Sequence, residues 1–373
     1  MNIPLVDLKA QYDQVRTEVR SAIDNVLSNT AFIGGEQVRI FEEGFAKYVG
    51  VNHCISCGNG TDALVLALKG LGIGPGHEVI VPANSFIATS EAVTCVGGRP
   101  VFVDCDEATY NLDSTLVEAA VTSNTKAIIA VHLYGMPGPM KELAAIAEKH
   151  GLFLIEDASQ AHGAKLGERS VGTMSDVATF SFYPGKNLGA YGDAGAVVTN
   201  RKNLAEFIAK YANHGRSAKY DHDMEGVNSR MDGLQAAVLN VKLKYLDSWL
   251  EKRIAIAAKY RELLDAKQYR YTLPLENVRH VYHLFVVRVH RRADILKELA
   301  HKGIQAGIHY PIALPFLNAY KHLNHISADF PVAHKLADEI LSLPIYPELT
   351  QMQVEYVATH LNAAVKPLTK EAP

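Results

Sequence analysis

Residues 126–157, KAIIAVHLYGMPGPMKELAAIAEKHGLFLIED, place two apolar runs on either side of one amphipathic segment. Each run has the length of a buried strand, and the segment between them has the apolar spacing of a helix. A strand, a helix and a second strand in this order form the unit from which parallel sheets are built. The stretch therefore predicts an α/β fold.

The same alternation extends in both directions from this stretch. Apolar strands are indicated at 53–57, 77–86, 177–184 and 195–200, with helix-like segments between most of them. From about residue 235 a long helical pattern is followed by one strong strand, HVYHLFVVRV at 280–289, and by further helices. We expect a large domain at 1–245, with helices flanking a mostly parallel sheet, and a smaller α+β domain at 246–373.

Composition excludes several classes of protein. The chain has 373 residues, 48% of them hydrophobic, and its 37 basic and 40 acidic residues give a net charge of -3. This balance does not favour nucleic acid or a membrane surface as a partner. The chain starts without the pattern of a signal peptide, and no apolar run is long enough to span a bilayer, so we expect a cytoplasmic protein.

The four cysteines do not indicate a disulfide framework in so long a chain. Cys54 and Cys57 form a C-x-x-C, but no second pair of ligands follows at the spacing of a zinc finger. Cys95 and Cys105 stand singly among apolar residues. We expect buried structural thiols and no metal site.

The first segment with chemical potential is CGNGTDALVLAL at 57–68, a strand end, a glycine turn and a helix start. Free N–H groups at a helix N-terminus favour an anion such as phosphate. Gly58, Gly60 and Ala63 also match the G-x-G-x-x-A of a dinucleotide site, although the acid Glu78 opens the next strand instead of closing it. Taken alone, an ordinary strand-to-helix turn explains the segment equally well.

A second segment, LFLIEDASQAHGA at 152–164, ends an apolar strand in Glu156 and Asp157. Ligands of open α/β sheets bind outside the carboxyl ends of strands, so Asp157 is well placed to meet one. A helix cap is the alternative explanation. The third segment, VATFSFYPGKNLGAYGDAGAVV at 177–198, places Lys186 in a glycine-rich turn. It is not a magnesium-phosphate loop, because Asn187 follows the lysine, and a solvated charge is the alternative.

Together the three segments supply what pyridoxal 5'-phosphate requires. The helix start receives the phosphate, Asp157 keeps the pyridine nitrogen protonated, and Lys186 provides the amine that reacts with the aldehyde. Phe86, at the end of HEVIVPANSF, offers an aromatic face to the ring.

The sequence resembles the DegT/DnrJ/StrS-type sugar aminotransferases, which belong to the fold type I, or aspartate aminotransferase-like, superfamily. The resemblance covers nearly the whole chain and rests on six segments in order: FIGGEQVRIFEEGFAKYVG, GNGTDAL, EDASQAHGA, FSFYPGKNLGAYGDAGAVVT, GVNSRMDGLQAAVLNVKL and LSLPIYPELT.

The resemblance implies roles for individual residues. Lys186 would be the Schiff-base lysine, Asp157 the partner of the pyridine nitrogen and Gln160 the partner of the ring hydroxyl. Phosphate would be held by Thr61 with its neighbours Gly60 and Asp62, and by Ser181, while Phe86 would stack on the ring. An asparagine in the position of Asn228 reaches the neighbouring subunit's cofactor in this family, which implies a homodimer with shared active sites.

Relatives that are dehydratases carry histidine in place of the lysine, so Lys186 favours transamination. The implied reaction is ping-pong, with L-glutamate as donor and a keto group of a nucleotide-linked sugar as acceptor. QAHGA and NSRMDGLQAAVLNVKL look more like the members that aminate 3-keto sugars, such as dTDP-3-keto-6-deoxyhexoses. A 4-keto sugar or a UDP-3-keto-hexuronate is the alternative substrate.

In this interpretation the sugar-nucleotide pocket draws on His162, Tyr183, Arg216, Arg230, His309 and Tyr310. For any one of these side chains, ordinary loop polarity or packing is an alternative explanation. Two other functions are also kept as hypotheses: an NAD-dependent oxidoreductase, and a sensory protein that binds the cofactor without turnover.

Overall fold

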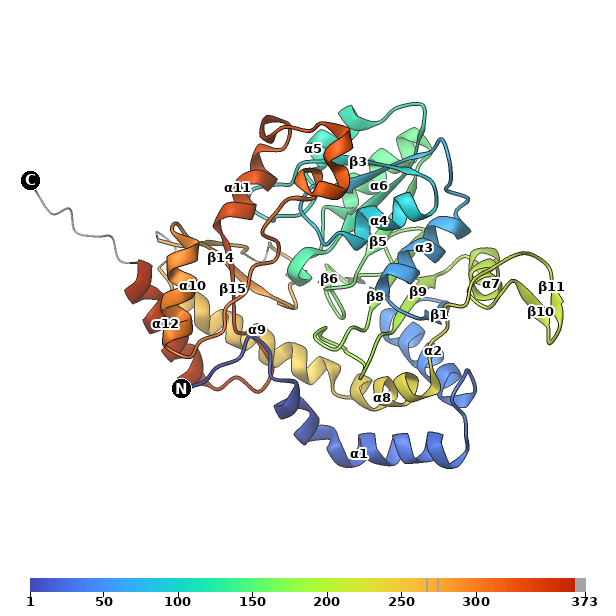
Figure 1. Ribbon diagram of the computed structural model, residues 1–373, viewed down its shortest axis with the longest axis horizontal. Coiled ribbons are helices and arrows are strands. Elements are labelled where there is room, and N and C mark those ends of the chain that lie inside the picture. Colours follow the sequence, from blue (N-terminus) through green and yellow to red (C-terminus); the bar gives the residue numbers. More distant parts are fainter. Residues whose placement is uncertain (266–267, 274, 366–373) are drawn as a thin grey trace, which may run out of the picture.

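The computed structural model describes residues 1–265, 268–273 and 275–365. Its centre is a seven-stranded sheet, shown in Figure 1, in the order β1-β9-β8-β5-β4-β2-β3. The strands are β1 (His53–Cys57), β2 (Glu78–Pro82), β3 (Arg99–Val103), β4 (Thr125–Val131), β5 (Phe153–Asp157), β8 (Val177–Ser181) and β9 (Gly195–Thr199). Only β9 runs against its neighbours, β1 and β8. The predicted α/β fold with a mostly parallel sheet is confirmed.

Alternate residues of the strands face two separate cores, because successive side chains of a strand point to opposite faces. In β4, Ala127, Ile129 and Val131 join one core, and Ile128 and Ala130 join the other. The first core is covered by α3 (Gly60–Gly70), α4 (Ala88–Cys95) and α7 (Lys202–Tyr211). The second is covered by α2 (Glu36–Val49), α6 (Met140–His150) and α8 (Gly233–Leu243). Helices therefore cover both faces, as expected.

The stretch at 126–157 folds as its pattern predicts, with α6 between β4 and β5. The helix α6 ends at Gly151, whose φ of 65° lies in the left-handed region that glycine adopts without strain. Val131 then pairs with Asp157 in the parallel register. This register brings the carboxyl ends of β4 and β5 to the same edge of the sheet.

The C-terminal part forms a second unit around a three-stranded antiparallel sheet, β12 (Arg270–Tyr271), β14 (Phe285–Arg288) and β15 (Ile340–Leu343). It packs with α9 (Leu246–Leu263), α10 (Arg292–His301) and α12 (Gln351–Val365) in a core of its own. The strand predicted at 280–289 is shorter than expected, since residues before Phe285 bond to the large domain instead, for example Val281 N to Gly135 O at 3.1 Å.

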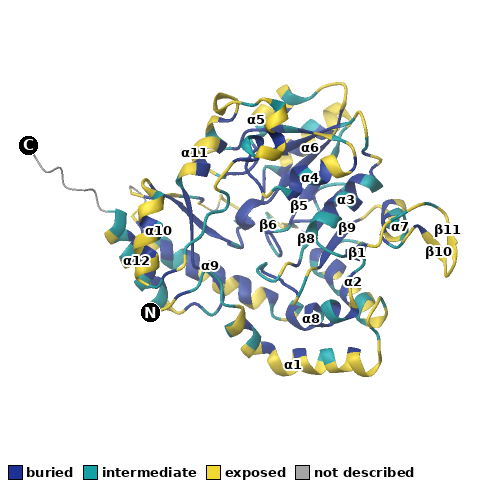
Figure 2. Cartoon of the chain, viewed as in Figure 1, coloured by how far each residue is buried: buried dark blue, intermediate teal, exposed yellow. Residues whose placement is uncertain are grey.

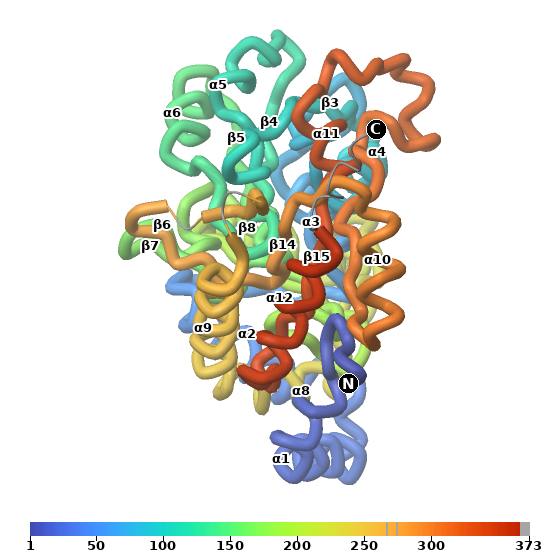
Figure 3. Tube along the Cα trace, turned by 90° about the vertical axis from the view of Figure 1, so that its left-hand side faces the viewer, coloured from blue at the N-terminus to red at the C-terminus, as the bar shows by residue number. Residues whose placement is uncertain are grey.

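Packing crosses the predicted boundary between 245 and 246 in two places. At the N-terminus, Ile3 pairs with Ile304 and joins the core of the second unit, so the chain starts beside α12 (Figure 3). Residues Leu314 and Tyr320, and Leu336 of α11 (Pro331–Glu339), join a core of the large sheet. The division at 245/246 stays a prediction.

Smaller elements surround these units: α1 (Leu8–Ser28), α5 (Ser114–Val117), the sheet of β6 (Lys165–Leu166), β7 (Arg169–Ser170) and β13 (Val278–Arg279), and the hairpin of β10 (Arg216–Ala218) and β11 (Asp221–His222). Figure 2 shows the central strands buried and the outer face of α1 exposed. The polar stretch at 213–230 contains the β10–β11 hairpin, which projects from the body of the molecule (Figure 1).

Three of the four cysteines, Cys54, Cys57 and Cys105, are buried, whereas Cys95 at the end of α4 is exposed. The expectation of a buried thiol is therefore wrong for Cys95, because the last turn of α4 leaves that side of the helix uncovered. In the part of the chain that the structure describes, no cluster of three or more potential metal ligands occurs. Over the same residues, no helix combines the length and the apolar character needed to cross a bilayer.

Candidate active site

The site is built at the carboxyl ends of β5 and β8. Asp157 is the last residue of β5 and is 5% exposed. Its Oδ2 accepts a hydrogen bond from Thr89 Oγ1 at 2.9 Å, and its Oδ1 accepts one from Ser159 N at 3.2 Å. Both carboxylate oxygens are thus held by donors, which fixes the orientation of the charge. Thr89 lies in α4, so the anchor comes from a different strand–helix unit.

Lys186 lies in the loop that joins β8 to β9, with its backbone N donating to Tyr183 O at 2.8 Å. Its side chain is half-buried. Burial lowers the pKa of the Lys186 amine to about 8, against the opposing effect of the Asp157 charge. With this pKa a far larger fraction of the Lys186 amine is neutral near neutral pH than for an ordinary lysine, and the neutral amine can act as a nucleophile and as a base.

Free hydrogen-bond donors lie where the start of α3 meets the end of β8. A Cβ on Gly60 would lie 2.5 Å from Ser181 Cβ, so only glycine lets the two elements approach this closely. In the described part of the chain, the N–H groups of Gly60 and Thr61 and the Thr61 hydroxyl have no hydrogen-bond partner. Ser181 Oγ accepts from Tyr183 N at 3.3 Å, which leaves its own proton to donate.

Asp62 is already engaged in holding this turn together. Its backbone N donates to the side chain of Asn59, the N-cap residue of α3, at 2.8 Å. Its carboxylate accepts from Ser229 Oγ at 2.6 Å. Of the three helix-start residues expected at the phosphate, Gly60 and Thr61 keep free donors and Asp62 does not.

Gln160 is held between two tyrosines. Its Oε1 accepts from Tyr134 N at 2.6 Å, and its Nε2 donates to Tyr310 Oη at 3.2 Å. The ring of Tyr310 lies 5.7 Å from the ring of Phe86, which is 52% exposed. Burial, with the nearby Asp157 charge, raises the pKa of Tyr310 well above its ordinary value, so its hydroxyl stays a proton donor. Gln160, Tyr310 and Phe86 therefore line the same side of the site.

His309 also belongs to this region. Its Nδ1 lies 2.8 Å from Ser342 Oγ, and its backbone O accepts from the Tyr134 hydroxyl. Burial and, next, the Lys186 charge lower its pKa. His309 and Tyr310 are thus brought to the lysine from the C-terminal part of the chain.

His162 is not brought to the surface of the site. It is 0% exposed and packs among Phe45, Phe180 and Phe182, with ring centroids 5.3 to 6.4 Å away. Neither ring nitrogen has a hydrogen-bond partner of ordinary geometry in the described residues, although the Ser181 backbone slightly favours the charged ring. Burial lowers its pKa to about 3. An expected sugar contact is here a core residue, because the chain turns inward directly after β5.

The remaining predicted residues lie at the surface. Tyr183 is 59% exposed, next to the Lys186 loop. Arg216 is exposed on the β10–β11 hairpin. Asn228 is exposed as well, and its Oδ1 accepts from Arg230 Nε at 3.1 Å. Among the described residues, no hydrogen bond, ion pair or ring contact joins Arg216, Asn228 or Arg230 to Asp157 or Lys186.

Sequence reasoning missed Thr89 and the buried support under Asp157. Glu156, 0% exposed, accepts from His132 Nε2 at 3.0 Å and from Gly172 N and Met174 N at 2.8 and 2.9 Å. His132 Nδ1 accepts from Gly138 N at 2.9 Å, which assigns the ring proton to Nε2. Successive side chains of a strand point to opposite faces, so the Glu156 side chain faces away from Asp157. This alternation could have predicted that Glu156 is buried on the other face of the sheet.

These groups fit pyridoxal 5'-phosphate. Unpartnered donors at the start of α3 suit a phosphate, the anchored Asp157 suits a ring nitrogen, and the amine of Lys186 suits an aldehyde. A dinucleotide site fits less well, because Glu78 stands at the first position of β2 and is bound to Thr122 Oγ1 at 2.6 Å.

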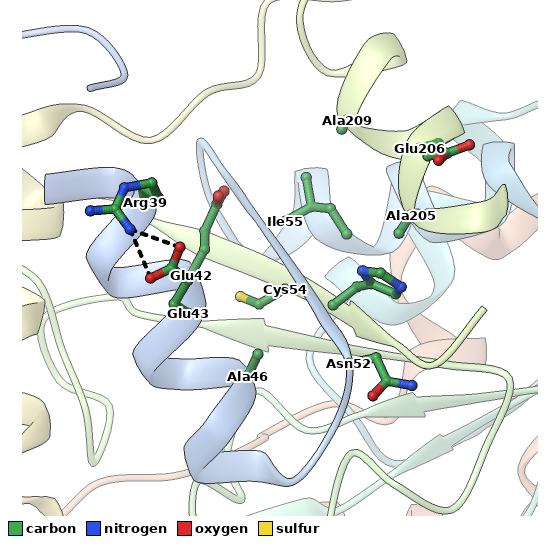
Figure 4. A pocket seen from close by; sticks show the side chains of 11 residues that line it. Arg39, Glu42, Glu43, Ala46, Asn52, Cys54, Ile55, Ala205, Glu206 and Ala209 are labelled. Carbon is green, nitrogen blue, oxygen red and sulfur yellow. Dashed lines mark hydrogen bonds and ion pairs between the residues drawn. The ribbon is translucent and has the colours of Figure 1, made fainter. Parts of the chain in front are cut away.

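A surface pocket of about 360 Å³ lies elsewhere, between α2, β1 and α7 (Figure 4). Its charged groups are already paired: Arg39 bonds Glu43 at 2.8 Å, and Glu42 accepts from Ser56 N at 2.8 Å. None of the predicted site residues lines it. This pocket is therefore separate from the predicted site.

Comparison with known proteins identifies relatives over almost the full length. A model of the DegT/DnrJ/EryC1/StrS aminotransferase family matches residues 13–362. The erythromycin biosynthesis sensory transduction protein EryC1 of Saccharopolyspora erythraea is 45% identical over 97% of this chain and 100% of its own length. The dTDP-3-amino-3,4,6-trideoxy-alpha-D-glucose transaminase of Streptomyces venezuelae is 44% identical over 94% of this chain and 93% of its own. The crystal structure of S. venezuelae DesV in complex with a ketimine intermediate superposes with a TM-score of 0.96, at 42% identity, covering 98% and 99% of the two chains.

Proposed function

Since the chain belongs to the DegT/DnrJ/EryC1/StrS aminotransferase family, we propose that it aminates the C-3 keto group of a nucleotide-linked keto-deoxysugar, such as a dTDP-3-keto-6-deoxyhexose. The enzyme is a pyridoxal 5'-phosphate-dependent transaminase. L-glutamate is the proposed amino donor. The choice of C-3 is supported by relatives whose names carry a 3-amino sugar, at 44% and 43% identity.

One observation carries the proposal. The amine of Lys186, with its pKa lowered to about 8, lies close enough to the buried carboxylate of Asp157 to feel its charge. A nucleophilic amine beside a fixed carboxylate is the pair that the cofactor requires, since pyridoxal phosphate supplies an electron sink for carbanion chemistry when bound.

The chain's own residues then have distinct tasks. Asp157 would keep the ring nitrogen protonated through its fixed carboxylate, while Gly60, Thr61 and Ser181 would hold the phosphate through N–H and O–H groups. The uncharged Nζ of Lys186 accepts a proton from Cα of the amino donor and releases it again, as a general base and then a general acid. Gln160 orients the ring from its hydroxyl side.

The experiment is a half-reaction with purified protein. Saturating L-glutamate should convert the lysine-bound cofactor into its amino form. 3-keto nucleotide sugars should then restore the lysine-bound form faster than 4-keto analogues do. Borohydride should attach the cofactor to Lys186, and Lys186→Ala should abolish both half-reactions. Faster return with a 4-keto sugar would reassign the acceptor carbon, and attachment at another lysine would overturn the assignment of Lys186.

A sensory role is the second candidate, because a 45% identical relative bears a sensory transduction name. The two functions are separated by turnover. A sensory protein binds the cofactor and gives no net amino transfer with any of the sugars, whereas a transaminase consumes glutamate stoichiometrically.

We further propose a cytoplasmic homodimer with active sites shared between subunits. The exposed amide of Asn228 supports this arrangement, because its Oδ1 is held by Arg230 while its Nδ2 has no hydrogen-bond partner among the described residues and can donate to a partner's cofactor. Arg216 and Arg230 lie in the segment 213–230 and are proposed to contact the acceptor substrate bound to the partner subunit. The residues proposed to contact that substrate within its own subunit are Tyr183, His309 and Tyr310. Concentration-dependent sedimentation tests the dimer. Mixed dimers of Lys186→Ala and Asn228→Ala test the shared site, because one of their two sites should regain both residues.

A further inference from the structure

The loop that carries Lys186 folds tightly back on itself. Ala190 N donates to Phe182 O at 2.7 Å, which closes the loop at its base. A Cβ on Gly189 would lie 2.3 Å from Pro184 O, so the two sides of the loop touch through their backbones. From outside, Asn187 Nδ2 donates to Val281 O at 3.3 Å and Tyr191 N donates to Gln235 Oε1 at 2.9 Å, so the position of the loop also depends on neighbouring elements.

Lys242 of α8 holds it from the core side. Its side chain is 0% exposed, and its Nζ donates to Gly189 O at 2.5 Å. The same ammonium lies 5.0 Å from the ring centroid of Tyr191, a residue of the loop, and 6.0 Å from that of Trp249. The lysine is therefore attached to the loop at two points.

A fully buried lysine is costly to a fold, and here its charge is only loosely compensated. Burial lowers the pKa of Lys242 to about 7, against the charge of Glu348. Both carboxylate oxygens of Glu348 are buried without a hydrogen-bond partner in the described residues, and burial raises its pKa. Core stability alone does not explain the buried lysine, since an apolar side chain of similar size is usually as good or better in such a place.

We propose that Lys242 is a positioning residue for Lys186, which it serves by fixing the loop through the carbonyl of Gly189. The inference rests on Lys186 being the reactive lysine, as proposed above. It acts through the backbone: Lys186 is three residues from Gly189, and the degree to which its amine is shielded from water follows from where the loop sits.

Burial and the Asp157 charge set the pKa of Lys186. Both depend on the position of the amine, so the pKa of Lys186 reports loop geometry. A loosened loop admits water and lets this pKa rise toward the ordinary value of a lysine. The reactivity of Lys186 therefore shows whether Lys242 positions the loop or only contributes to stability.

The experiment measures amine reactivity in the cofactor-free protein, by competitive acetylation across pH 6.5–10 and mass spectrometry of the Lys186 peptide. The test variant combines Lys242→Met with Glu348→Gln, because the Glu348 charge acts on Lys242, while Arg253 and Lys252 also act on that carboxylate. Glu348→Gln alone is the matched control, because it keeps the Lys242–Gly189 bond. In the test variant the pKa of Lys186 should rise by about one unit relative to the control, which gives about tenfold less neutral amine at pH 7.

A second control addresses general destabilisation. Val238→Ala truncates a buried side chain of α8 that faces α1 rather than the loop. It should lower thermal stability and leave the Lys186 profile unchanged. If the double variant does not fold, Lys242→Gln is measured instead. Its side chain is one bond shorter than that of lysine, and the variant should have about threefold less neutral Lys186 amine at pH 7 than the unchanged protein.

Kinetics of the glutamate half-reaction give an independent readout. The double variant should lose about tenfold in kcat with KM for glutamate within twofold of the control. A Lys186 profile equal to that of Glu348→Gln, or an equal shift in Val238→Ala, overturns the proposal. Acetylation requires no cofactor, so the two proposals can fail separately. If the double variant shows the shifted Lys186 profile but the unchanged protein does not transaminate, the proposed function is refuted and the positioning role of Lys242 is retained.

Discussion

Replacing His162 by leucine should make the protein more resistant to acid. The imidazole is 0% exposed among three phenylalanines, and burial lowers its pKa to about 3. In the unfolded chain a histidine titrates near pH 6.5. Because the folded value lies below the unfolded value, the contribution of neutral His162 is complete above pH 6.5 and is lost as the pH falls below it.

The magnitude follows from the two pKa values. At pH 5.5 the unfolded state is stabilised by protonation of this histidine by about 1.4 kcal/mol, and at pH 7.5 by about 0.1 kcal/mol. The difference in unfolding free energy between His162→Leu and the unchanged protein should therefore grow by about 1.3 kcal/mol between the two pH values. At pH 7.5 the variant should already be equal or more stable, since it removes a buried ring without hydrogen-bond partners.

Urea unfolding of both proteins at pH 7.5, 6.5 and 5.5 measures this difference directly. His280 and His283, whose pKa values burial also lowers, are present in both proteins, so their protonation cancels. A difference that stays constant across the series, within about 0.5 kcal/mol, would refute the assignment of His162 as a neutral core residue. It would favour an ionised His162 in contact with a ligand.

Three further changes test the site. Gly60→Ala places a Cβ 2.5 Å from Ser181 Cβ and should weaken cofactor affinity about tenfold, as measured by absorbance titration. Thr89→Val removes the donor to Asp157 and should slow the glutamate half-reaction about tenfold in stopped flow, with thermal stability changed by no more than about 1 kcal/mol. Glu156→Ala leaves buried donors unpaired and should lower the unfolding free energy by about 3–5 kcal/mol in urea titrations. Burial raises the pKa of Glu156, but the hydrogen bonds from His132, Gly172 and Met174 lower it by more, so the net shift is downward. The stabilisation by Glu156 is therefore present above the unfolded pKa and is lost as the pH falls through the folded pKa.

The sheet and its central pair were predictable because their signals are local. An apolar run that ends in Asp157 marks the carboxyl end of β5 without knowledge of any other strand. Lys186 follows β8 in the same way. In a parallel sheet such ends meet at one edge, so two local signals were sufficient to predict one site. The family resemblance then supplied roles that position alone does not give.

Contacts between distant segments were not predictable in this way. Thr89 and Asp157 are 68 residues apart, and their bond depends on how α4 packs against β5. His162 follows the strand end by five residues, which suggested a ligand contact, but the chain turns it into the phenylalanine cluster. Lys242 reads as an ordinary helix cation, and only its burial shows that it holds Gly189.

The site also depends on both units of the chain. Tyr134, from the turn after β4, donates its backbone N–H to Gln160 and its hydroxyl to the carbonyl of His309. Gln160 in turn donates to the hydroxyl of Tyr310, 150 residues away in sequence. Tyr134 and Gln160 therefore join the lysine-bearing sheet to the segment that presents His309 and Tyr310. A relative shift of the two units would move His309 and Tyr310 while leaving Asp157 and the donors at the start of α3 in place. Substitutions at this junction should therefore change the choice of acceptor substrate more than they change cofactor affinity.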